Sequence, residues 1–134
     1  MARAKVKDDT KKILVVEDEK PLREAFCYLL ESEGFIVMPA ENGQIGLQKL
    51  KGGFRPNLIL LDMIMPVMDG MAFLRQAKLV REHPRTRTLM LSNLSDAITF
   101  DEAHTFGVTK SVLKADLSPA QLADVVKKML SESD

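Results

Sequence analysis

The chain has 134 residues, of which 46% are hydrophobic and 28% charged, and its 19 basic side chains balance its 19 acidic ones. This length and composition fit one domain with its own core, and a net charge of zero gives no reason to expect nucleic acid or a membrane as the main partner. No apolar run approaches the length of a membrane span, so we expect neither a membrane-spanning helix nor a signal peptide. The single cysteine, Cys27, excludes an internal disulfide and suits a reducing cytoplasm, where we expect the protein to reside.

The chain begins with a polar segment and then takes up a strand and a helix. Residues 1–11 are charged and aperiodic, which predicts a flexible N-terminal tail. The β-branched and leucine run at 13–16 is typical of a buried parallel strand. Pro21 then begins a helical stripe of apolar residues, which Gly34 ends.

The middle of the chain repeats this alternation. Residues 35–39 predict a second strand, and Asn42 is placed to cap a second helix. Residues 57–61 predict a third strand, and a third helix follows Gly70 and ends before Pro84. Residues 88–92 predict a fourth strand.

The last part of the chain completes the pattern. Ser95 or Asp96 is expected to cap a fourth helix that runs to about Gly107, and residues 110–114 predict a fifth strand. Ser118, followed by a proline, starts the last helix.

Five strand–helix repeats with short connections imply right-handed crossovers and a parallel sheet with helices on both faces. We therefore predict an α/β, doubly wound, flavodoxin-like (βα)5 domain with strand order 2-1-3-4-5. It should cover residues 12–131 and leave a short C-terminal tail at 132–134.

Polar side chains gather where the predicted strands end. Glu17 and Asp18 follow strand 1, Asp62 follows strand 3, and Ser92 and Lys114 end strands 4 and 5. In a sheet of this order the ligand site lies at the carboxyl ends of the strands, near strands 1 and 3, so three carboxylates should share a small volume. Like charges raise one another's pKa unless a cation is present, and Mg²⁺ suits such oxygen ligands. A carboxylate nucleophile, a divalent ion, a lysine and a hydroxyl together predict a phosphoryl-transfer site.

Each of these residues also has an ordinary structural interpretation. Acids after strands often lie in solvated loops, Asp62 could cap a turn, Ser92 could bond to backbone, and Lys114 could be a surface lysine. Their coincidence at four strand ends of one sheet edge favours function. His83 and His104 have no second ligand at metal spacing, so we expect surface roles for both.

Four segments, ILVVEDE, LLDMIMPVMDG, LMLSN and SVLKAD, resemble in order the signature segments of the response-regulator receiver domain of two-component signalling. The resemblance covers about residues 12–131. It implies that Asp62 accepts a phosphoryl group from a phosphohistidine of a sensor histidine kinase or phosphotransfer protein. It also implies that Asp18 and Asp62 bind Mg²⁺, or Mn²⁺ in its place, together with the backbone carbonyl of Ile64, while Glu17 holds a metal-bound water.

The same resemblance implies a switch. Lys114 would contact the phosphoryl group, and Ser92 would move toward it and change the face formed by the fourth helix, the fifth strand and the fifth helix. That face would control a protein partner, which the sequence does not identify, or the phosphoryl group would pass along a relay. No DNA-binding helix-turn-helix follows in the sequence, so we expect neither nucleic acid nor a membrane as a partner.

Three departures from the family pattern modify these expectations. Ser111 stands where the family usually has an aromatic switch residue, so we expect a smaller or differently transmitted rearrangement. Ala115 follows Lys114 where a proline with a cis bond is common, so we expect a trans bond. Ile64 and Leu94, at the two positions that tune hydrolysis, are apolar and cannot orient water, so we expect a long-lived phosphorylated state.

The leading hypothesis is a phosphorylatable signalling module that is not an enzyme beyond phosphorylating and slowly dephosphorylating itself. One alternative is an Mg²⁺-dependent phosphohydrolase with Asp62 as nucleophile, but such enzymes normally place an acid/base carboxylate two residues later, where this chain has Ile64. Another is a scaffold that never takes phosphate, which the intact residue set argues against. The sequence ends soon after the last helix, which indicates a stand-alone receiver or a segment of a longer protein.

Overall fold

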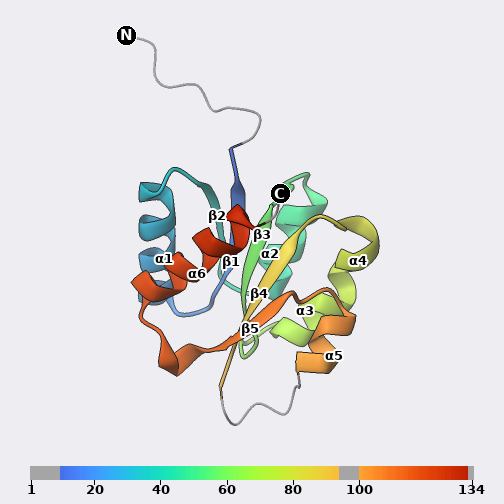
Figure 1. Ribbon diagram of the computed structural model, residues 1–134. Helices are drawn as coiled ribbons and strands as arrows, with labels where there is room; N and C mark the ends of the chain where they lie inside the picture. Colours follow the sequence, from blue (N-terminus) through green and yellow to red (C-terminus); the bar gives the residue numbers. More distant parts are fainter. Residues whose placement is uncertain (1–9, 94–99, 133–134) are drawn as a thin grey trace.

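The computed structural model describes residues 10–93 and 100–132. Its strands form one parallel sheet in the order β2-β1-β3-β4-β5 (Figure 1). They are β1 (Lys12–Val16), β2 (Ile36–Ala40), β3 (Leu58–Asp62), β4 (Arg87–Ser92) and β5 (Lys110–Leu113). The predicted doubly wound α/β fold and its strand order are therefore confirmed.

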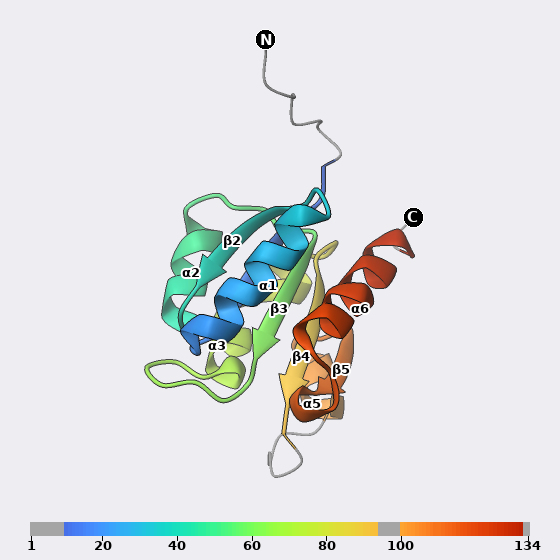
Figure 2. The same ribbon diagram turned by 90° about the vertical axis from the view of Figure 1, so that its left-hand side faces the viewer.

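Helices cover both faces of this sheet. They are α1 (Lys20–Ser32), α2 (Gly43–Lys51), α3 (Gly70–Ala77), α4 (Leu79–Glu82), α5 (Phe100–Thr105) and α6 (Pro119–Ser131). Figure 2 shows α1 and α6 on one face, with α2 and α3 on the other. Each face of the sheet has its own hydrophobic core, and successive side chains of the central strands point into the two cores in turn. Leu14 and Leu61 pack toward α2 and α3, while Val15 and Leu60 pack toward α1 and α6. Burial on both faces explains why these strands are continuously apolar.

The predicted helix ends are confirmed at three places. Gly34, just after α1, has a left-handed φ of 97°, which glycine adopts without a steric penalty. Asn42 caps α2 by accepting a hydrogen bond from the Ile45 amide at 2.9 Å. At α6 the Ser118 hydroxyl accepts from the Gln121 amide at 3.2 Å, and the Gln121 side chain accepts from the Ser118 amide at 2.8 Å.

The prediction of one continuous helix after Gly70 is wrong, because the structure has two helices, α3 and α4. Lys78 separates them with a left-handed φ of 52°, through which an α-helix cannot continue. On an unbroken helix Leu79 would lie off the apolar stripe that ends at Ala77. The break turns Leu79 into the core, where it is 2% exposed, and leaves Val80 in solvent.

One boundary near the site differs slightly from the sequence interpretation. The fifth strand ends at Leu113, and Lys114 begins a 3₁₀ turn, η1 (Lys114–Asp116). The predicted caps Ser95 and Asp96 lie outside the described residues. Within the described ranges all peptide bonds are trans, including the one before Ala115, and no helix there is long and apolar enough to span a membrane.

Candidate functional site

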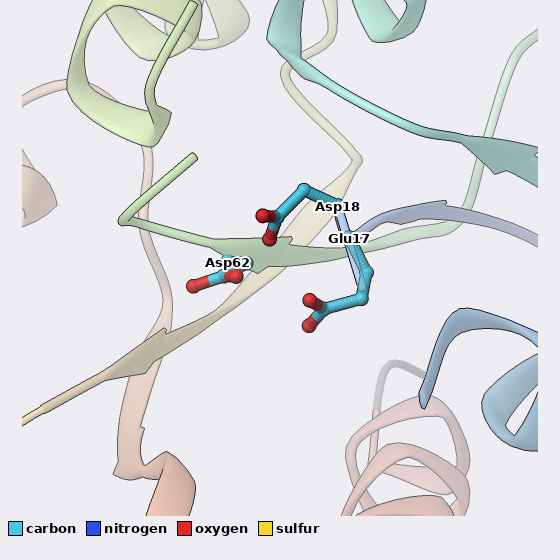
Figure 3. A group of neighbouring side chains, drawn as sticks. All are labelled: Glu17, Asp18 and Asp62. Atoms are coloured by element: carbon cyan, nitrogen blue, oxygen red, sulfur yellow. The ribbon is translucent and has the colours of Figure 1, made fainter. Parts of the chain in front are cut away.

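Strand ends bring the predicted residues to one edge of the sheet. Glu17 and Asp18 follow β1, Asp62 ends β3, Ser92 ends β4 and Lys114 follows β5. One oxygen from each of the three carboxylates Glu17, Asp18 and Asp62 lies within 4.8 Å of the other two (Figure 3). We call these three residues the acid cluster. The structure thus brings together the carboxylates that the strand order predicted to be neighbours.

Glu17 is the most deeply buried member of the acid cluster, at 1% exposure. Its Oε2 accepts from the Glu19 amide at 3.1 Å and from Lys114 Nζ at 3.2 Å. Its Oε1 also lies 3.2 Å from Nζ, but outside hydrogen-bonding geometry, so this buried oxygen has no hydrogen-bond partner. Burial, and next the charge of Asp62, raise the pKa of Glu17 to about 7, although Glu19 and Lys114 oppose the rise.

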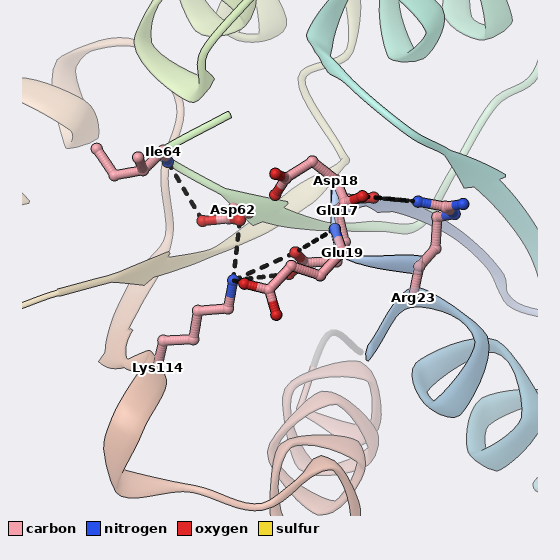
Figure 4. Close-up of polar contacts among 7 residues, drawn as sticks. All are labelled: Glu17, Asp18, Glu19, Arg23, Asp62, Ile64 and Lys114. Atoms are coloured by element: carbon pink, nitrogen blue, oxygen red, sulfur yellow. Dashed lines mark hydrogen bonds and ion pairs between the residues drawn. The ribbon is translucent and has the colours of Figure 1, made fainter. Parts of the chain in front are cut away.

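Asp62 lies at the centre of the site and is 3% exposed. Its Oδ2 accepts from Lys114 Nζ at 3.0 Å, and its Oδ1 accepts from the Ile64 amide at 3.2 Å. Burial raises the pKa of Asp62, whereas the hydrogen bond and charge of Lys114 and the Ile64 amide act in the opposite direction. The side chain of Ile64 is 54% exposed and points away from Asp62 (Figure 4).

Among the described residues, Lys114 is the cation that forms ion pairs with the acid cluster. Its ammonium group contacts Asp62 and Glu17, and Glu19 lies further off at 3.9 Å (Figure 4). Burial lowers the pKa of Lys114, but the hydrogen bonds and charges of Asp62 and Glu17 outweigh it, so the pKa is raised. Lys114 therefore stays protonated, and two buried carboxylates share one positive charge.

Ser92 reaches the same edge without joining the acid cluster. It pairs in register with Leu113 of β5 and is 9% exposed. Among the described residues no hydrogen bond links its hydroxyl to Asp62 or Lys114. Leu94, whose apolar side chain was expected to leave the attacking water unoriented, lies outside the described ranges.

The sequence interpretation missed Arg23, which holds the loop between β1 and α1. Its Nη1 donates to the backbone carbonyls of Glu17 at 2.8 Å and Asp18 at 3.3 Å (Figure 4). From the sequence, an arginine on the first turn of an amphipathic helix is ordinarily expected to point into solvent. No pattern in the sequence indicated that its side chain turns back to the preceding loop.

The structure explains the Asp69-Gly70 pair at the start of α3. Asp69 caps α3 by accepting from the Ala72 amide at 2.9 Å. A Cβ atom on Gly70 would lie 2.7 Å from Met63 Cα and 2.8 Å from the Asp62 carbonyl oxygen, so only glycine lets α3 start this close to Asp62.

The donors of this edge fit a hard divalent cation. They are carboxylate oxygens, the residue type that Mg²⁺ prefers, gathered within 4.8 Å from three side chains. Burial raises the pKa of both Glu17 and Asp62, and Glu17 Oε1 lacks a hydrogen-bond partner. One lysine therefore leaves the acid cluster short of positive charge, which a divalent ion would supply.

The chain is similar to proteins of one family over most of its length. Residues 13–127 match the family described as the response regulator receiver domain. The phosphate regulon transcriptional regulatory protein PhoB of Klebsiella pneumoniae is 39% identical over 79 residues, which are 59% of this chain and 33% of that protein. The transcriptional regulatory protein ResD of Bacillus subtilis (strain 168) is 34% identical over 121 residues, which are 89% of this chain and 48% of that protein. The chain spans between a third and a half of the length of these curated relatives.

Solved structures show the same fold. A response regulator receiver domain protein (CheY-like) from Methanospirillum hungatei JF-1 superposes with a TM-score of 0.80 at 27% identity. The superposition covers 93% of this chain and 97% of that one.

Proposed function

We infer the function of this chain from the family to which it belongs, the response regulator receiver domain of two-component signalling. It is a signalling domain, of a kind that generally binds Mg²⁺ and interacts with histidine kinases or phosphotransfer proteins. We propose that Asp62 accepts the phosphoryl group. The observation that carries the proposal is the contact of 3.0 Å between Lys114 Nζ and Asp62 Oδ2 beside two further carboxylates.

In the proposed reaction a carboxylate oxygen of Asp62 attacks the phosphorus of a phosphohistidine. The O–P bond forms as the P–N bond breaks, and the electron pair of the broken bond stays on the imidazole nitrogen, which leaves. The Ile64 amide, which donates to Oδ1, limits rotation of the carboxylate and so orients the attacking group.

Lys114 supplies fixed positive charge for this step. Its raised pKa keeps the ammonium charged, and it already lies against the acceptor oxygen. As the phosphoryl group arrives, Lys114 exchanges a carboxylate oxygen for a phosphoryl oxygen and offsets the charge that gathers there.

A divalent ion would be held by the residues that the family resemblance indicates. In our proposal Asp18, Asp62 and the Ile64 carbonyl are direct ligands, and Glu17 holds a metal-bound water. When bound, Mg²⁺ or Mn²⁺ offsets the negative charge of the phosphoryl oxygens and of the acid cluster. The shortage of positive charge around Glu17 and Asp62 supports this assignment.

The output follows from the position of Ser92 beside β5. We propose that Ser92 moves toward the phosphoryl group and that the face of α5, β5 and α6 changes with it; these are the fourth helix, fifth strand and fifth helix expected from the sequence. Ser111, half-buried on β5, offers no aromatic ring to transmit this movement, so the rearrangement should be small. The face would control a protein partner or the phosphoryl group would pass on in a relay.

Two other functions fit the site less well. A phosphohydrolase needs an acid/base group near the aspartyl phosphate, and Ile64 supplies only an exposed apolar side chain there. A scaffold that is never phosphorylated would not require three carboxylates gathered beside one lysine. Neither alternative is favoured by an observation of its own.

The proposal is tested by intact-mass measurement after incubation with Mg²⁺ and a small acyl phosphate. We expect one stable added phosphoryl group on the parent, none on Asp62→Ala, and none on the parent in EDTA. Rapid multiple turnover of the donor would support the hydrolase instead. No adduct on a folded parent would support the scaffold.

A further inference from the structure

Arg23 donates hydrogen bonds to the turn that carries two of the three acids, two from its side chain and one, the first bond of α1, from its backbone. Its side chain donates to the carbonyls of Glu17 and Asp18, and its backbone amide donates to the Glu19 carbonyl at 2.8 Å. One residue therefore holds three consecutive backbone carbonyls. These are the only residues between the end of β1 at Val16 and the start of α1.

This turn has few other restraints. The Glu17 amide continues the sheet by donating to the Ala40 carbonyl at 3.0 Å, and the Glu19 amide donates to the Glu17 side chain. Apart from Arg23, no hydrogen bond from the described residues reaches the Asp18 carbonyl. The guanidinium and the Glu17 side chain thus hold the peptide between Asp18 and Glu19 from its two sides, the first at the carbonyl and the second at the amide, and this peptide carries the backbone of Asp18.

The charge of Arg23 is also placed differently from that of Lys114. Figure 4 shows the two cations on opposite sides of the acid cluster, and in the described part of the chain no carboxylate lies within 4 Å of Arg23 in an ion pair. Lys114 occupies oxygens of Asp62 and Glu17 that a metal or phosphoryl group would need. Arg23 bonds only to backbone carbonyls and leaves every carboxylate oxygen of the acid cluster available.

We propose that Arg23 is a positioning residue for the divalent-ion site: by fixing the carbonyls of Glu17 and Asp18 it preorganises the two carboxylates that precede α1. This inference rests on the proposed function, because it assumes that the acid cluster binds a divalent ion. Residues that orient metal ligands from outside typically contribute roughly 10- to 100-fold to metal affinity.

The test is Mg²⁺ binding to the unphosphorylated protein, measured by calorimetry on the full chain. We expect Arg23→Ala to weaken Mg²⁺ binding roughly tenfold or more, and to shift the Mg²⁺ concentration that half-saturates phosphorylation by the same factor. The phosphorylation rate at saturating Mg²⁺ should stay close to that of the parent. Lys20→Ala is the matched control, because it removes an exposed positive charge from the same turn of α1 and should leave both values unchanged.

Arg23→Lys separates geometry from charge. It keeps the charge but loses the planar guanidinium, so it should restore Mg²⁺ affinity only in part. Full restoration by lysine, or equal weakening in Lys20→Ala, would overturn the proposal by showing that charge alone matters. Urea unfolding in EDTA checks that each variant folds. If Arg23→Ala does not fold, Arg23→Gln, which keeps an amide donor, replaces it.

The outcomes distinguish this inference from the proposed function. If the parent binds Mg²⁺ in an Arg23-dependent manner but is never phosphorylated, the proposed function fails and the positioning role stands. If the parent is phosphorylated and Arg23→Ala binds Mg²⁺ as tightly as the parent, the positioning role alone is refuted.

Discussion

The metal-free protein should lose stability as the pH rises from about 4.5 to about 7, and Glu17→Gln should abolish most of this loss. Glu17 is 1% exposed, and burial together with Asp62 raises its pKa from 4.5 to about 7 in the folded state. Between these values the folded protein keeps a proton that the unfolded chain releases. Raising the pH therefore favours unfolding.

The size of the effect follows from the two pKa values. Below pH 4.5 the carboxyl group is protonated in both states and contributes no pH dependence. Above pH 7 it is ionised in both, and the folded state has lost about 3 kcal/mol, at about 1.4 kcal/mol for each pKa unit. This is a large fraction of the roughly 5–15 kcal/mol that a small domain has in total. The pKa of Asp62 is also raised, so its contribution has the same sign and remains in the variant.

The assay is urea unfolding in EDTA at a series of pH values from 4.5 to 8, for the parent and for Glu17→Gln. Glutamine keeps the shape and an acceptor oxygen for the Glu19 amide and Lys114, but it does not titrate. We expect the free energy of unfolding of the parent to fall about 3 kcal/mol further over this range than that of the variant. Excess Mg²⁺ should reduce the fall in the parent, because a bound cation favours the ionised carboxylates.

Glu19→Gln is the control, because Glu19 lies near the same lysine with its side chain 62% exposed. This variant should follow the pH dependence of the parent. Equal slopes in the parent and Glu17→Gln, or a parent that gains stability between pH 5 and 7 in EDTA, would refute the reasoning.

Three further substitutions test the loop after Asp62. Val67 has a left-handed φ of 71° and is 75% exposed, so Val67→Gly should raise the free energy of unfolding by up to about 1 kcal/mol in a urea titration. Val80 is an exposed helical valine of normal φ, so the control Val80→Gly should lower the free energy of unfolding by about 0.5 kcal/mol in the same titration. Gly70→Ala should lose about 1–3 kcal/mol and be phosphorylated more slowly, because its Cβ would displace the backbone of Met63 and Asp62; normal stability and rate would contradict this. Ile64→Gln should orient an attacking water and so shorten the lifetime of the phosphorylated state at least about tenfold, as followed by loss of the added phosphoryl mass. If the parent protein lost its phosphoryl group completely within about a minute, the long-lived phosphorylated state expected with Ile64 would be contradicted.

The fold and the proximity of the three acids were predictable because both follow from the hydrophobic pattern of the strands and from the strand order. Continuous apolar runs such as 13–16 and 58–61 mark buried parallel strands, and the order of the strands then places Glu17, Asp18 and Asp62 at one edge. Taken alone, Glu17 could have been a solvated loop residue. Its burial at 1% follows from the three-dimensional neighbours and not from its local sequence.

The parts that were not predicted depend on local backbone geometry. Nothing in the sequence near Lys78 signals a left-handed residue, because lysine is a good helix former and the break is stabilised by burying Leu79. The role of Arg23 was hidden because it acts on backbone carbonyls, which leave no mark in residue identity. The Ile64 amide, which donates to Asp62, was missed for the same reason.

The central claim, that Asp62 is the phosphoryl acceptor, is tested most directly by locating the modified residue. Borohydride reduces an aspartyl phosphate to homoserine, so the protein is treated with Mg²⁺ and an acyl phosphate, reduced, digested and sequenced by mass spectrometry. We expect homoserine at position 62 alone. Reduction product at Glu17 or Asp18, or a stable phosphoryl group on a hydroxyl such as that of Ser92, would contradict it.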